Sequence, residues 1–92
     1  MLFVDITTWD PKDNEEVHKR FENWEDPEGI KMIGQWLDIA SCRIVQVYDV
    51  ENTEAYAASL FPWRDICYID SFPVMDPEEA IKFADKHPEL FE

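Results

Sequence analysis

The chain has 92 residues, of which 21 are Asp or Glu and 8 are Lys or Arg, and its formal net charge is -13. A charge of this size repels phosphate backbones and anionic lipid surfaces, which excludes nucleic acid and membranes as expected partners. The hydrophobic fraction of 46% predicts one compact domain over residues 1–92, and a domain this short is expected to cover its remaining apolar surface by association.

The first strand is predicted over residues 2–9, in which aliphatic residues alternate with aromatic and polar ones. This segment lacks the basic start and the cleavage site of a signal peptide, and no apolar run is long enough for a membrane span, so we expect a soluble, cytoplasmic protein. A helix follows, with Asp10 as its N-cap and Pro11 at its first position. Its apolar stripe consists of Val17, Phe21 and Trp24.

Two further strands are predicted over residues 30–39 and 43–50, joined by a turn that lacks the Gly or Asn of a type I′ hairpin. A second helix is predicted over residues 53–61, with either Asn52 or Thr53 as its N-cap. Its apolar stripe, continued just past the end of the helix, consists of Tyr56, Leu60 and Trp63.

A fourth strand is predicted over residues 65–74, where Pro73 suits a strand end or a sheet edge. A third helix starts at Pro77 after the N-cap Asp76 and stops at Pro88. The resulting order, β-α-β-β-α-β-α, predicts an α+β fold of the ferredoxin-like split βαβ type. Its four-stranded antiparallel sheet carries two main helices on one face, and the third helix is an addition at the C-terminus.

Several short motifs occur in an order that is similar to a family of short uncharacterised proteins assigned to the dimeric α/β-barrel superfamily. The matching residues are Met1, Leu2 and Phe3, then Gly34 and Trp36-x-Asp38, then Trp63-x-Asp65, then Pro73-Val74. The resemblance extends to about residue 75 and implies a homodimer that closes a barrel between two sheets. Thr7 stands where that family often has a glutamate, which weakens the case for a shared acidic site.

The two faces of the sheet differ in composition. The more aliphatic face is predicted to pack against the helices, and it consists of Leu2, Val4, Ile6, Ile33, Leu37, Ile39, Val45, Val47, Cys67 and Ile69. The aromatic and polar face is then expected to be covered by a second copy in a twofold homodimer with space between the sheets. This arrangement needs an odd number of loop residues in the hairpin, with Trp36 opposite Gln46 and Gly34 opposite Tyr48.

Asp5 and Asp70 are the candidate catalytic residues, because a carboxylate within an apolar strand is costly unless it is solvated or paired. Inside a barrel, either could act as a general base with a raised pKa. Alternatively, both carboxylates face water at the rim or pair with Arg43 or Arg64. The candidate ligand-binding residues are Thr7, Trp36, Gln46, Tyr48 and Tyr68, with plain dimer core as the alternative reading.

No metal or cofactor is expected. Cys42 and Cys67 are far apart and are expected to be reduced, and together with His18 and His87 they do not form a zinc motif. His18 is expected to be a partly exposed helix residue. The chain has two glycines and no phosphate loop, which disfavours nucleotides. Some members of the superfamily that the chain resembles ligate haem through a histidine on a helix facing the cavity. The second helix here has no histidine, which disfavours haem.

Three functions remain open. The first is a homodimer with a cavity between its two sheets that binds a small apolar or aromatic molecule. The second is an enzyme resembling the cofactor-independent monooxygenases of the superfamily, or an isomerase, with an interior carboxylate as base. The third is a purely structural dimer whose interior is filled by side chains.

Overall fold

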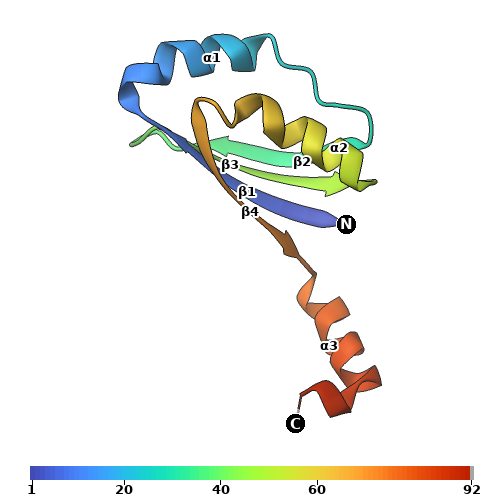
Figure 1. Ribbon diagram of the computed structural model, residues 1–92. Helices are drawn as coiled ribbons and strands as arrows, with labels where there is room; N and C mark the ends of the chain where they lie inside the picture. The colour runs from blue at the N-terminus through green and yellow to red at the C-terminus, as the bar shows by residue number, and fades with distance from the viewer. Residues whose placement is uncertain (92) are drawn as a thin grey trace.

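The computed structural model describes residues 1–91 and contains one four-stranded antiparallel sheet with the strand order β2-β3-β1-β4 (Figure 1). The strands are β1 (Leu2–Trp9), β2 (Ile30–Leu37), β3 (Arg43–Val50) and β4 (Cys67–Val74). The helices are α1 (Asn14–Glu22), α2 (Thr53–Leu60) and α3 (Pro77–Lys86), accompanied by the 3-10 turns η1 (Pro11–Asp13), η2 (Phe61–Trp63) and η3 (Pro88–Leu90). The predicted element order and the α+β ferredoxin-like fold are confirmed.

The predicted caps set the starts of the helical segments. The side chain of Asp10 accepts a hydrogen bond from the backbone N of Lys12, and Asp76 caps α3 in the same way. Asn52, and not Thr53, caps α2, by accepting from the backbone N of Ala55 at 2.8 Å. Each cap satisfies a backbone donor that the helix itself leaves free.

Strand β2 ends at Leu37, two residues earlier than predicted. The carboxylate of Asp38 accepts a hydrogen bond from the backbone N of Ala40 at 2.8 Å and pairs with the guanidinium of Arg43 at 2.7 Å. This side chain therefore starts a turn where the alternating pattern had indicated more strand. Ile39, expected in the core, is fully exposed.

Helices α1 and α2 lie on one face of the sheet (Figure 1). The prediction of which side chains of β1 and β3 they cover is wrong. The covered face is the aromatic and polar one: Asp5 is paired across the sheet with Gln46, and Trp9 with Cys67. The buried residues of β1 are Asp5, Thr7 and Trp9, whereas Val4 and Ile6 on the other side are only half-buried.

The prediction of which side chains face the helices is correct for β4, where these residues are Cys67 and Ile69. On β2 a register shift between Met32 and Gly34 reverses the alternation. As a result, Met32 lies on the covered face and Trp36 on the other, although they are an even number of residues apart. The expected pairs are wrong as well: Trp36 lies opposite Val45, and Gly34 opposite Val47.

We call the uncovered side of the sheet the open face. Its larger residues are Leu2, Val4, Ile6, Trp36, Val45, Val47, Tyr68 and Phe72. The indole of Trp36 lies against Gly34 so closely that a Cβ at position 34 would be 2.5 Å from a ring carbon. The glycine therefore allows the ring to lie across the strand, where Trp36 is 61% exposed.

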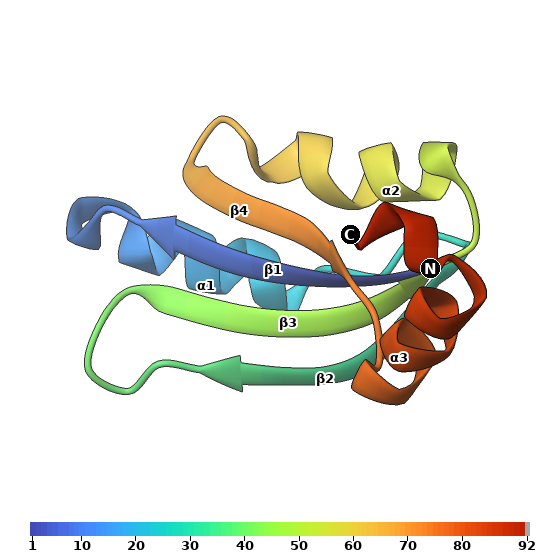
Figure 2. The ribbon, with the colours of Figure 1, turned by 90° about the horizontal axis from the view of Figure 1, so that it is seen from below.

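Helix α3 stands away from the rest of the chain, on the side of the sheet opposite α1 and α2 (Figures 1 and 2). The radius of gyration is 15.9 Å, against about 12 Å for a compact domain of this length. The core cluster lies between the sheet and α1, and it is built on Trp9, Val17 and Cys67. The packed part of the chain is therefore the sheet with α1 and α2.

Candidate functional site

A cavity of about 170 Å³ lies between the covered face of the sheet and the layer formed by α1, α2 and η2. We call it the inner cavity. Aromatic rings form much of its wall, and they come from β1, α1, the segment just after α1, and η2: Trp9, Phe21, Trp24 and Trp63. The stripes predicted for the first two helices thus contribute to the wall of a cavity and do not fill the core completely.

The carboxylate of Asp5 and the hydroxyl of Tyr48 meet on the sheet side of this cavity. The Tyr48 hydroxyl lies 2.7 and 2.8 Å from the two oxygens of Asp5, to which it donates, and the two residues are only 2% and 5% exposed. Burial raises the pKa of Asp5, against hydrogen bonds from Ser71 and Tyr48 that lower it. Burial also raises the pKa of Tyr48, and the Asp5 carboxylate adds to that shift. Among residues 1–91 no Lys or Arg pairs with Asp5, so its partners are hydroxyl groups.

Five further polar side chains line the inner cavity: Thr7, His18, Asp26, Gln46 and Ser59. Thr7 is buried beside Asp5, and the amide of Gln46 donates to Gln35 at 3.0 Å. His18 of α1 lies edge-on to Trp9, with 6.3 Å between the ring centroids. His18 was not predicted as a cavity residue. It lies outside the apolar stripe of α1 and is exposed, although it also lines the cavity.

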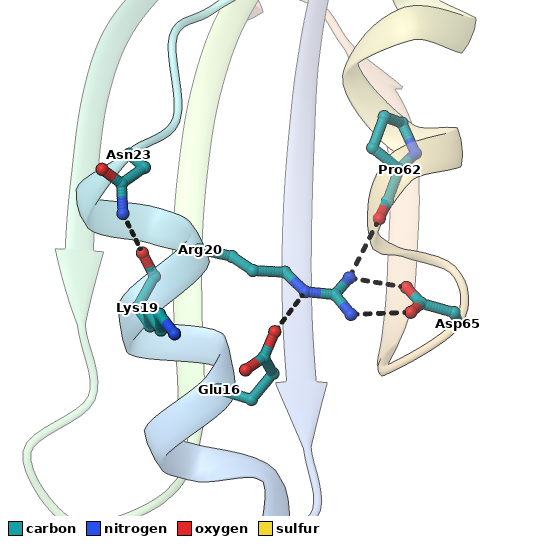
Figure 3. A network of polar contacts seen from close by, with 6 residues as sticks. All are labelled: Glu16, Lys19, Arg20, Asn23, Pro62 and Asp65. Atoms are coloured by element: carbon teal, nitrogen blue, oxygen red, sulfur yellow. Dashed lines mark hydrogen bonds and ion pairs between the residues drawn. The ribbon is translucent and has the colours of Figure 1, made fainter.

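Arg20 ties α1 to the turn between η2 and β4 across the sheet (Figure 3). Its guanidinium makes two hydrogen bonds of 2.8 Å with Asp65, one of 3.3 Å with the carbonyl of Pro62 and one of 3.1 Å with Glu16. The bond from Arg20 lowers the pKa of Asp65. A second link between the same elements is the edge-to-face contact of Trp24 with Trp63, at 5.4 Å. Together they hold the helical layer that covers the inner cavity.

The candidate residues from the sequence divide between the two faces of the sheet. Those on the inner cavity are Asp5, Thr7, Gln46 and Tyr48. Those on the open face are Trp36, Tyr68 and Asp70. The alternation placed all of these residues on one face of the sheet. That prediction is wrong, because the face that the helices cover depends on packing that the alternation does not encode.

The suggested ion pairs of the two aspartates are wrong. Arg43 pairs with Asp38, and the guanidinium of Arg64 lies 4.8 Å above the ring of Phe61. Asp70 is exposed on the open face, opposite Ile6, as the solvent-facing alternative expected. Among residues 1–91, Asp5 is the one buried carboxylate, and it faces the inner cavity.

Both cysteines are free thiols. Burial raises the pKa of Cys67 to about 11, so this thiol is protonated at neutral pH and is a poor nucleophile. Residues 1–91 contain no group of three His, Cys, Asp or Glu side chains that could hold a metal ion. In the same part of the chain, no helix has both the length and the apolar character needed to cross a membrane.

The fold and the site together define a ferredoxin-like α+β domain with a partly polar cavity between its sheet and its two main helices. The model of a family described as "Domain of unknown function (DUF3303)" matches residues 1–88, and the chain belongs to this family. The comparisons with curated proteins and with solved structures found no match. The resemblance to an uncharacterised family is thus confirmed, and membership of the dimeric α/β-barrel superfamily stays a prediction.

Proposed function

We propose that the inner cavity binds a small, neutral, aromatic molecule that donates a hydrogen bond to Asp5. The observation that supports this is a buried carboxylate, hydrogen-bonded to Tyr48, at one side of a cavity whose walls are mainly apolar and include four aromatic rings besides Tyr48. Small-molecule sites commonly combine such apolar walls with a few polar groups that fix orientation. The site differs from the one expected from the sequence, since it lies within each chain and not between two sheets.

The size of the cavity limits the ligand. An apolar cavity of roughly 150 Å³ is known to hold benzene. The 170 Å³ of the inner cavity therefore suits one aromatic ring or a small bicyclic molecule.

The charge of the site disfavours anions, and the number of donors on an ammonium group disfavours cations. An anion would approach the Asp5 carboxylate in a chain of net charge -13. An ammonium group has three donors to satisfy, whereas Asp5 already accepts from Tyr48 and Ser71. A single hydroxyl donor needs one free acceptor site, so a hydroxyl-bearing aromatic molecule fits best.

Titration by NMR with four one-ring probes tests this proposal. We expect phenol to bind at least about tenfold more tightly than toluene, because a hydrogen bond to a charged acceptor contributes about 1.5–3 kcal/mol. Benzoate and benzylamine should bind more weakly than phenol. Equal affinities for phenol and toluene would contradict the role of Asp5, and the tightest binding by benzylamine would contradict a neutral ligand.

We also propose that the protein is a homodimer, with a second copy covering the open face. Val4, Ile6 and Val47 are half-buried within a single chain, and Tyr68 is 78% exposed. An apolar surface of this extent is typical of an association site. A dimeric α/β barrel is the arrangement in which the two open faces cover each other.

A second candidate function is enzymatic, with Asp5 as general base. Its raised pKa brings the carboxylate closer to the range in which a base works at neutral pH. In an isomerase, Asp5 would take a proton from one carbon of the substrate and return it to another. In a cofactor-independent monooxygenase, the deprotonated substrate would react with dioxygen. Asp5→Asn should then abolish turnover, while a hydroxyaromatic probe still binds, more weakly, because the amide oxygen remains an acceptor. Turnover that survives this change would exclude the role.

A further inference from the structure

Helix α3 presents apolar side chains that no other helix or strand of residues 1–91 covers, although Phe83 contacts the rings of His87 and Phe91 just beyond the helix. It begins after the Asp76 cap, and none of its residues is buried. Ile81 is 61% exposed and Phe83 is 42% exposed, although one side of the helix is apolar and the other charged. An amphipathic helix of this kind gains its stability by packing its apolar side against another surface.

The exposed area of the chain indicates how large that missing contact is. The chain exposes 6981 Å², whereas a compact monomer of 10.9 kDa exposes about 5,600 Å². The excess of about 1,400 Å² is more than the roughly 800 Å² that each partner buries in a standard protein interface. The excess is therefore large enough for one protein interface, which a second copy of the chain can supply.

The linker to α3 is short and directs the helix outward. Only Met75 and Asp76 separate the end of β4 from Pro77. Proline disfavours a helical conformation in the residue before it, and Asp76 is extended, with φ of -60° and ψ of 136°. The helix consequently projects on the side of the open face, near the end of the sheet where β1 begins (Figure 2).

We propose that α3 is an exchanged arm: in the homodimer, the helix of each copy packs its apolar side against the other copy. This inference rests on the homodimer proposed above and adds a specific contact to it. The arm and the open face project on the same side of one chain, so a twofold axis that brings the open faces together also brings each arm to the partner. The apolar side of the arm consists of Ala80, Ile81, Phe83 and Ala84.

Light scattering across a dilution series of the full chain tests the arm. Ile81→Asp places a charge on the apolar side of α3, and Lys82→Asp places the same residue on the opposite, charged side as a control. Tyr68→Asp places it on the open face. All three positions are exposed in a single chain, so the variants should fold. We expect at least a tenfold weaker dimer for Ile81→Asp and Tyr68→Asp and little change for Lys82→Asp.

The results separate the two proposals. A dimer weakened by Tyr68→Asp and unaffected by Ile81→Asp would overturn the arm and leave the homodimer standing. A wild-type monomer at micromolar concentration would overturn both. In a dimer made from labelled and unlabelled chains, isotope-filtered NMR should detect contacts between Ile81 and the other copy. Contacts of Ile81 only within its own chain would exclude exchange.

Discussion

Removal of the Tyr48 hydroxyl tests whether the buried carboxylate depends on it. In Tyr48→Phe, Asp5 loses a donor at 2.7 Å in a place where it is only 5% exposed, so water replaces the bond poorly. A hydrogen bond to a charged group contributes about 1.5–3 kcal/mol and one between neutral groups about 1 kcal/mol. We therefore expect the free energy of unfolding to fall by about 2 kcal/mol at pH 7, and by about half as much in acid, where Asp5 is protonated.

The direction of this pH dependence follows from linkage. The loss of the donor raises the pKa of Asp5 in the folded state further above its unfolded value. A raised carboxylate pKa stabilises the fold at low pH, and that contribution is lost as pH rises through the folded pKa. The deficit of the variant should therefore grow with pH.

Urea unfolding at several pH values and one fixed chain concentration measures this deficit. Tyr68→Phe, which removes an exposed hydroxyl from the open face, is the matched control and should change little. A loss below about 0.5 kcal/mol for Tyr48→Phe, or a loss that is the same in acid and at pH 7, would refute the reasoning.

Three other changes give distinct outcomes. Asp5→Asn removes a buried charge, so it should raise the free energy of unfolding at neutral pH relative to wild type, and this gain should shrink towards acid pH. A lower free energy of unfolding for the variant at pH 7, measured with urea, would contradict this expectation. Asp65→Asn weakens the link to Arg20 that holds α1 over the inner cavity, so stopped-flow measurements should detect faster phenol release than in wild type. An unchanged rate would show that this link does not control ligand release. Gly34→Ala brings a Cβ against the exposed indole of Trp36, and the ring should move away at a small cost in stability. Unchanged NMR chemical shifts of the Trp36 indole would contradict the close contact.

Local signals in the sequence were sufficient for the order and the starts of the elements. Asp10, Asn52 and Asp76 are short polar residues that bond to backbone donors a few positions ahead, and such contacts are encoded within one turn of chain. The same kind of signal, Asp38, was overlooked as a turn residue because it continued an alternating pattern. The predicted strand was therefore too long at its end.

The orientation of the sheet could not be obtained from local signals. Along each strand, aliphatic residues alternate with aromatic or polar ones, so the pattern separates two faces. Tertiary packing, and not this pattern, determines which of the two faces the helices cover. The bulge between Met32 and Gly34 then changed the alternation within one strand, which placed Trp36 away from Gln46. The general expectation that the more aliphatic face lies under the helices failed, because the covered face here surrounds a cavity.

The motif Trp63-x-Asp65 shows how much of the site depends on distant contacts. Trp63 contributes to the wall of the inner cavity, and Asp65 bonds to Arg20, a residue 45 positions away. The spacing of the two motif residues was visible in the sequence. The pairing of Asp65 with Arg20 could not be predicted from the sequence. The chain has 21 Asp and Glu residues, and no local signal indicates which of them Arg20 contacts.

The most direct test of the inner cavity compares phenol binding by two variants that each add one aromatic ring. Val17→Phe extends a buried α1 residue into the cavity, whereas Ala58→Phe places the same ring on the exposed side of α2. NMR titration should show phenol binding to wild type and Ala58→Phe, with shifts centred on Asp5 and Thr7, and no binding to Val17→Phe at equal probe concentrations. Binding that persists in Val17→Phe, or shifts that centre on the open face, would contradict the account.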